Sequence, residues 1–221
     1  MSIQSSLRRS DLVKYVTRQC NNFFYDTYEV NEEEFRDSVD DTLKRVEYCF
    51  SHINLPYYKE DSRPFFNHLN GDHYSIFLCY LSQYLYSQKG NEILASKIFL
   101  LNKLLFGIDA FYKIQFPDIF LLVHPLGTVM GRAEYKNNLV IYQGVTIGAT
   151  TEGIYPIFSE NTILYSNSSI IGNCKLGANL VMGANSSIVN FSVEDNMTVV
   201  GSFPQNRIFK SSDLINHYFI R

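Results

Sequence analysis

Bulky apolar side chains recur at every sixth position through the second half of the chain, at Phe158, Leu164, Ile170, Leu176, Met182 and Ile188. An asparagine follows each of the first five by three residues, at Asn161, Asn167, Asn173, Asn179 and Asn185. A period of six fits neither a helix nor a simple alternating strand. It predicts a solenoid of short strands and tight corners, the hexapeptide β-helix. The apolar residues would point inward, and the asparagines would form corners at positive φ, which Asn tolerates well.

The same phase extends backward less regularly, through Tyr135, Ile141 and Ile147. The step from Ile147 to Phe158 is eleven residues rather than twelve, which predicts a loop at one corner. Because three hexapeptides make one coil, residues 112–203 predict roughly five coils. A chance run in a β-sandwich would not explain two positions that repeat in step.

The first half of the chain lacks this repeat and has helical periodicity. Apolar residues at three- and four-residue spacing follow an acidic helix start at Asn31, and further helices are expected over 72–88 and 91–106. We therefore predict a helical N-terminal domain over residues 1–108. A left-handed parallel β-helix of hexapeptide repeats with a short C-terminal tail follows over 109–221. The left hand is the known exception of hexapeptide solenoids to the right-handed rule.

Composition and charge give no indication of binding to nucleic acid, a membrane or a metal ion. The 221 residues carry a formal charge of −3, and no long basic run indicates nucleic-acid binding. The polar N-terminus does not resemble a secretory signal, and no run of eighteen apolar residues predicts a membrane span. Four cysteines without C-x-x-C spacing favour a reducing, cytoplasmic location. His68 and His73 lack a third ligand, so no metal site is predicted.

One histidine is the best candidate for a general base. His124 lies at the start of the predicted solenoid, between an apolar stretch and a glycine-rich one, and Asp109 precedes it by fifteen residues. With coils of about eighteen residues, the two side chains should lie on adjoining coils and form a hydrogen bond. A carboxylate behind an imidazole fixes its tautomer and stabilises the imidazolium that a base forms. The alternative is a structural histidine at a corner.

The polar stretch 65–73 has two interpretations. It could fold over an acceptor site, or it could be a solvated turn between helices, and we favour the turn.

Residues 107–207 resemble the catalytic domain of the serine O-acetyltransferase branch of the hexapeptide acyltransferases. The resemblance lies in Gly107-Ile108-Asp109, His124-x-x-Gly127-x-Val129-x-Gly131, Gln143-Gly144-Val145-Thr146-Ile147-Gly148, Ile170-Ile171-Gly172-Asn173 and Gly201-Ser202-Phe203-Pro204. It implies that His124 is the base, that Asp109 supports it, and that an acceptor hydroxyl attacks acetyl-CoA directly. It further implies that CoA contacts Gly148, Ala149, Ser166, Ala184 and Gly201, with an N–H near Ala149 meeting the thioester oxygen. The family builds its site between subunits of a trimer, and trimers can pair.

The chain departs from that family where the amino acid would bind. Val123 replaces an aspartate before the catalytic histidine, Phe111 falls in a changed segment after Asp109, and Tyr155 lies in a loop without the family's Asp-Arg-His-Pro. Binding an amino acid's carboxylate without an arginine is costly in a partly dry site. We therefore expect Val123, Phe111 and Tyr155 to contact a sugar or surface polysaccharide as acceptor. The alternatives are a serine O-acetyltransferase of cysteine biosynthesis and a non-catalytic trimeric scaffold.

Overall fold

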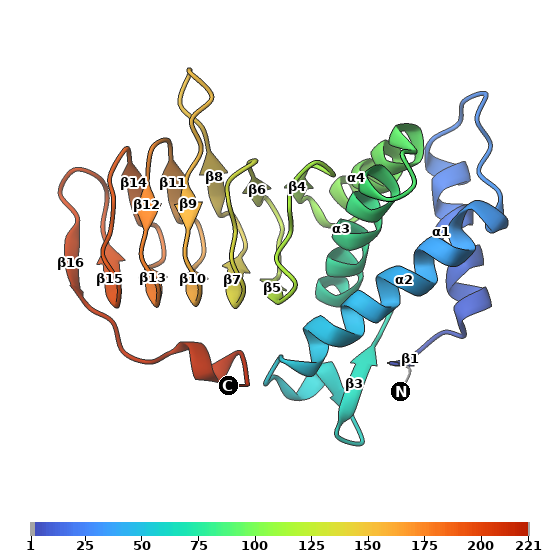
Figure 1. The fold of residues 1–221 in the computed structure, drawn as a ribbon, viewed down its shortest axis with the longest axis horizontal. Coiled ribbons are helices and arrows are strands. Elements are labelled where there is room, and N and C mark those ends of the chain that lie inside the picture. Colours follow the sequence, from blue (N-terminus) through green and yellow to red (C-terminus); the bar gives the residue numbers. More distant parts are fainter. Residues whose placement is uncertain (1–2, 221) are drawn as a thin grey trace.

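The computed structural model describes residues 3–220, so the outer ends of the two predicted domains, residues 1–2 and 221, lie outside the described residues. A helical region comes first and a parallel β-solenoid follows it, as predicted (Figure 1). The α-helices are α1 (Arg9–Phe23), α2 (Glu32–Ser51), α3 (Gly71–Ser87) and α4 (Glu92–Phe106). The predicted division at residue 108 stays a prediction; β4 begins at Asp109.

Three of these helices follow the sequence pattern. The Asn31 side chain accepts hydrogen bonds from the backbone of Glu33 and Glu34, and Glu34 reaches back to the Asn31 N–H, which completes a capping box. The predicted apolar face of α2 is fully buried. α4 ends at Gly107, whose φ of 65° is the left-handed conformation expected of a helix C-terminus.

The predictions missed the first helix and the short strands between α2 and α3. α1 buries Leu12, Val13, Val16 and Cys20 on one face, a pattern as periodic as that of α2, so the signal was present in the sequence and was overlooked. The segment expected to be irregular holds a 3₁₀ turn, η1 (Pro56–Tyr58), and strands β2 (Lys59–Glu60) and β3 (Arg63–Phe66). β3 pairs with β2 and with β1 (Gln4–Ser5).

The solenoid strands form three faces. The first face holds β5 (Phe120–Val123), β7 (Leu139–Tyr142), β10 (Thr162–Leu164), β13 (Leu180–Met182), β15 (Met197–Val200) and β16 (Arg207–Lys210). The second face holds β4 (Asp109–Ala110), β6 (Val129–Met130), β8 (Thr146–Gly148), β11 (Ser169–Ile171) and β14 (Ser187–Val189). The third face holds β9 (Ile157–Phe158) and β12 (Lys175–Leu176). All of these pairings are parallel except that of β16 with β15.

The six-residue repeat is realised almost as predicted. The inward apolar side chains from Phe158 to Ile188 are buried. Positive φ occurs at Asn161, Asn167, Asn179 and Asn185 but not at Asn173, so the prediction for that corner is wrong. Gly172 makes the turn there instead, with φ of 84°, and a Cβ at this position would clash with the Asn190 side chain.

The loop between β8 and β9 is longer than the sequence phase suggested. Ile147 pairs with Ile170, 23 residues on, whereas Ile163 pairs with Val181, 18 residues on. The coil therefore carries a five-residue insertion, and it projects from one edge of the solenoid (Figure 1).

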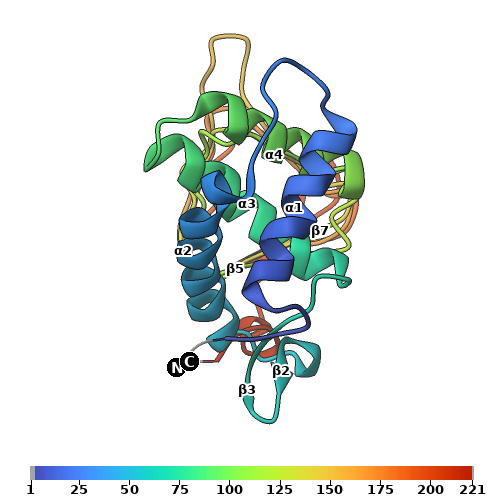
Figure 2. The ribbon, with the colours of Figure 1, turned by 90° about the vertical axis from the view of Figure 1, so that its right-hand side faces the viewer.

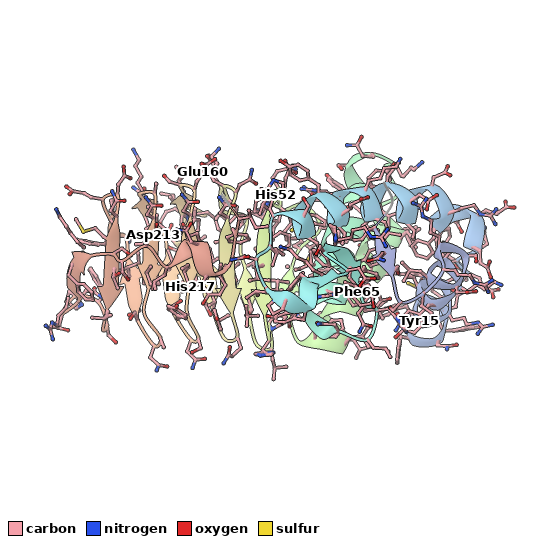
Figure 3. The ribbon with its side chains drawn as sticks, turned by 90° about the horizontal axis from the view of Figure 1, so that it is seen from below. Tyr15, His52, Phe65, Glu160, Asp213 and His217 are labelled. Carbon is pink, nitrogen blue, oxygen red and sulfur yellow. The ribbon has the colours of Figure 1, made fainter. Side chains whose placement is uncertain are left out.

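The helical region caps the first coil, and the chain returns to it after the last one. In the end-on view the helices stand in front of the solenoid (Figure 2). After β16 the chain runs back beneath the first face, past Asp213 and His217, toward His52 (Figures 1 and 3). There the Asn54 N–H donates to the Tyr218 carbonyl (2.7 Å) and the Ile220 N–H donates to the His52 carbonyl (2.8 Å). We call residues 211–220 the return segment.

Among residues 3–220, no helix combines the length and apolar character that crossing a membrane requires.

Candidate active site

His124 occupies the corner that follows β5, where the helical region meets the solenoid. Its φ of 48° lies in the left-handed region, and its side chain is exposed. The corner is tightly stacked: the Gly127 N–H donates to the Gly107 carbonyl (3.0 Å), and the Gly144 N–H donates to the Leu126 carbonyl (3.0 Å). Gly107 has φ of 65°, a left-handed conformation that favours glycine at this corner.

A pocket of about 810 Å³ opens beside His124. Its walls come from the start of α3, the end of α4 and the His124 corner, and are formed by Tyr57, Asn67, Leu69, Asn70, Gly71, Asp72, Leu105, Phe106, His124, Pro125 and Leu126. Part of the polar stretch 65–73 therefore lines the pocket, and whether it covers an acceptor or serves only as a turn stays a prediction. These lining residues include no lysine or arginine.

The predicted hydrogen bond between Asp109 and His124 is not formed. Asp109 carboxylate instead accepts from Lys103 Nζ at 2.7 Å. Asp109 pairs with Val129 of the next coil, so the first coil is twenty residues long. The residue stacked on Asp109 is thus Val129, and His124 lies five residues before it. The eighteen-residue estimate therefore misplaced the two side chains relative to each other. In the part of the chain that the structure describes, the His124 ring makes no hydrogen bond.

The carboxylate that contacts His124 belongs to Asp72, which sequence reasoning did not single out. Asp72 Oδ1 accepts a hydrogen bond from the His124 backbone N–H at 3.0 Å. Burial raises the pKa of Asp72, while this hydrogen bond and the charge of His124 oppose the shift. The available signal was the helix-start pattern Asn70-Gly71-Asp72, but nothing in it connects α3 with a residue 52 positions away.

The three residues expected to contact the acceptor do not line this pocket. Val123 lies in β5 with only 7% of its side chain exposed. Phe111 packs its ring against Phe99 of α4, with centroids 5.4 Å apart. Tyr155 lies against Gly131, where a Cβ would come within 2.6 Å of the tyrosine ring. Each of the three side chains therefore packs against other parts of the protein and does not face this pocket.

The five residues expected at CoA fall on two edges of the solenoid. Ser166, Ala184 and Gly201 lie near the edge between the first and second faces, which is also the edge of His124. Gly148 and Ala149 lie at the end of β8, on the opposite edge of the second face. One chain therefore presents the two groups on either side of a sheet rather than in one groove.

Comparisons with known proteins agree on one family. No family model matches the chain. Serine acetyltransferase of Staphylococcus xylosus is 32% identical over 121 residues, which cover 53% of this chain and 55% of that protein. Serine acetyltransferase of Staphylococcus aureus strain Mu50 is 31% identical over 121 residues, covering 53% and 56%. The chain thus spans about half the length of the curated relatives it matches.

Solved structures match over nearly the whole chain. Serine acetyltransferase from Brucella abortus strain S19 gives a TM-score of 0.69 at 20% identity, covering 92% of this chain and 84% of that one. The chain has the fold of serine acetyltransferases. A structure of Neisseria gonorrhoeae serine acetyltransferase gives 0.71 at 22% identity, covering 94% and 81%. A serine acetyltransferase in complex with CoA gives 0.70 at 18% identity, covering 92% and 85%.

The similarity to the serine acetyltransferase-like branch, predicted from the motifs around His124, is thereby confirmed at the level of sequence and fold. Within residues 3–220, no group of three or more His, Cys, Asp or Glu side chains is arranged to hold a metal ion.

Proposed function

We propose that this chain is an acetyl-CoA-dependent O-acetyltransferase with His124 as its general base. The observation that carries the proposal is an exposed imidazole at an open pocket, on a fold shared with a serine acetyltransferase that was solved with CoA. The similarity of half the chain to curated serine acetyltransferases supports the same reaction class.

The proposed reaction is a direct transfer. The acceptor hydroxyl gives its proton to the His124 ring while its oxygen attacks the thioester carbonyl of acetyl-CoA. The carbonyl oxygen becomes an oxyanion, for which a backbone N–H near Ala149 is the proposed donor. The carbon–sulfur bond then breaks, and the leaving thiolate takes the proton back from His124. The products are an acetyl ester and CoA.

Serine is the first candidate acceptor. The curated relatives are serine acetyltransferases, and a Neisseria gonorrhoeae relative of the same fold was solved in complex with serine. A sugar hydroxyl, the acceptor we expected from the sequence, is the second candidate. The lack of a lysine or arginine among the pocket-lining residues favours it, because a serine carboxylate would find no cationic partner there.

The test is an assay of CoA release with serine, free sugars, nucleotide sugars and polysaccharide, with products identified by mass spectrometry. We expect His124→Ala to lower kcat about 100-fold or more while the KM for acetyl-CoA stays within about twofold. Full activity in that variant would remove His124 from the mechanism. CoA binding without turnover of any acceptor would favour the scaffold alternative.

We also propose that the site is completed between subunits of a trimer. The placement of the CoA candidates on two edges supports this, since a neighbouring chain would bring Gly148 and Ala149 to the Ser166 edge. Light scattering on the purified protein measures the assembly. A reducing, cytoplasmic location remains our proposal, supported by four cysteines that are all free and buried.

A further inference from the structure

Asp72 forms a direct link between the helical region and the His124 corner. It is the second residue of α3, after the Asn70 cap, and only 8% of the residue is exposed. Its Oδ1 accepts from the His124 N–H at 3.0 Å across the boundary between α3 and the solenoid. The His124 N–H lies in a corner outside any helix or strand, so it has no backbone partner from secondary structure. The Asp72 side chain supplies the acceptor that this N–H needs.

The corner needs such a contact because of its backbone. His124 has φ of 48°, a left-handed conformation that residues other than glycine adopt with strain. A hydrogen bond to the N–H of the strained residue favours this geometry over extended alternatives. The carboxylate is therefore placed where it can fix the direction in which the imidazole leaves the backbone.

Among residues 3–220, Asp72 is the acidic residue whose side chain accepts a hydrogen bond from His124. Asp109 is engaged with Lys103, and the ion pairs of residues 3–220 include none that involves Asp72. Asp72 and His124 line the same pocket.

We propose that Asp72 is a positioning residue for His124: its carboxylate oxygen holds the left-handed corner and keeps the imidazole at the pocket. The part of this role that concerns catalysis rests on the proposed function. The structural part, the hydrogen bond and the corner geometry, can be tested without turnover.

The catalytic arm compares Asp72→Asn with Asp72→Ala. The asparagine side chain retains an acceptor oxygen for the His124 N–H, and alanine does not. We expect Asp72→Ala to lower kcat about tenfold or more with both KM values nearly unchanged, because a misplaced base reduces the rate of the chemical step. Asp72→Asn should recover most of that loss.

The control for stability is Asn31→Ala, which removes the cap of α2 away from the pocket. It should destabilise the fold by an amount typical of a lost helix cap while leaving kcat unchanged. Equal loss in Asp72→Asn and Asp72→Ala would overturn the proposal, because the acceptor oxygen would then not matter. A rise in the acceptor KM with unchanged kcat would overturn it as well, since Asp72 would then bind the acceptor.

The second arm follows the His124 backbone amide by NMR as a function of pH. Burial raises the pKa of Asp72, so the amide signal should move when Asp72 titrates, above the usual carboxyl range. The other titratable groups near Asp72 are His124, Tyr57, Tyr58 and the adjacent His73. Movement that persists in Asp72→Asn does not come from Asp72. Burial lowers the pKa of the adjacent His73 to about 4, so His73 accounts for acid-range movement of this kind.

The expected result is a His124 amide signal with a titration step in the wild type that is missing in Asp72→Asn, and an amide that exchanges with solvent faster in Asp72→Ala. An amide that is equally protected in Asp72→Ala would overturn the proposal. If the wild type acetylates no acceptor, the proposed function fails, and this arm still decides whether Asp72 holds the corner.

Discussion

At the scale of single residues, His73 shows why proximity to a pocket does not make a histidine a base. Its ring is fully buried, and its centroid lies 4.2 Å from that of Tyr58 and 4.8 Å from that of Phe50. Nδ1 accepts from the Asn67 N–H at 3.2 Å. Burial lowers the pKa of His73 from 6.5 to about 4, so the ring is neutral at pH 7. We conclude that His73 is structural.

His73 should make stability depend on pH. Its folded pKa lies below its unfolded one, so protonation favours the unfolded chain. Its contribution is complete above pH 6.5 and is lost as the pH falls toward 4, by about 3 kcal/mol in all. Urea unfolding of the wild type and His73→Gln between pH 7 and 4 measures this. The wild type should lose more stability than the variant, because carboxylates affect both alike; parallel slopes would contradict the assignment.

The sequence located part of the site at this scale. His124 could be found because it is the one histidine at the start of the hexad region, next to glycines that the stacked corner requires. Asp72 could not be found, because its contact joins residues 52 positions apart in elements of different periodicity. The bond to Asp109 was mispredicted because the first coil is twenty residues long instead of eighteen.

At the scale of elements, the asparagines of one edge are linked by their side chains. Asn138 Nδ2 donates to Asn161 Oδ1 (2.8 Å), Asn161 to Asn179 (3.0 Å), and Asn179 to Asn196 (2.7 Å). All of these residues have positive φ. The sequence predicted the positive φ of Asn161 and Asn179 but not the ladder of side-chain amides. The six-residue period locates the corners and carries no information on contacts between coils.

Asn179→Val should be far more costly than Asn173→Val. At 179, a β-branched residue would be forced to positive φ and both ladder bonds would be lost, for about 2 kcal/mol or more. Asn173 is exposed and has no positive φ, so its replacement should cost less than about 0.5 kcal/mol. The midpoint of urea unfolding measures both. Equal destabilisation would refute the assignment of the corner to Gly172 instead of Asn173.

At the scale of the whole molecule, the return segment joins the far end of the solenoid to the helical region. Phe219 is 3% exposed and forms an antiparallel bridge with Ile53. The Tyr218 hydroxyl lies 2.8 Å from that of Tyr142 and 3.4 Å from that of Tyr165. The sequence predicted a short tail and gave no sign of its path, because these contacts lack any repeat.

Phe219→Ala should destabilise the protein by about 3 kcal/mol, since it empties a buried aromatic site. Urea unfolding measures the loss, and limited proteolysis should cut the released segment sooner. Phe209→Ala is the matched control, because Phe209 lies on β16 with 51% of the residue exposed and should cost less than about 1 kcal/mol. Equal effects of the two substitutions would show that the return segment is not anchored through Phe219.

The path of the return segment also bears on how the coils open. Stacked repeats contact only their neighbours, so an uncovered terminal coil can fray without cost elsewhere. Here β16 covers β15, and the chain beyond it is fastened at His52 and Asn54, next to the opposite end of the stack. Unfolding of the last coil would therefore also break contacts beside the first coil. We therefore expect the solenoid and the helical region to unfold together in one cooperative transition.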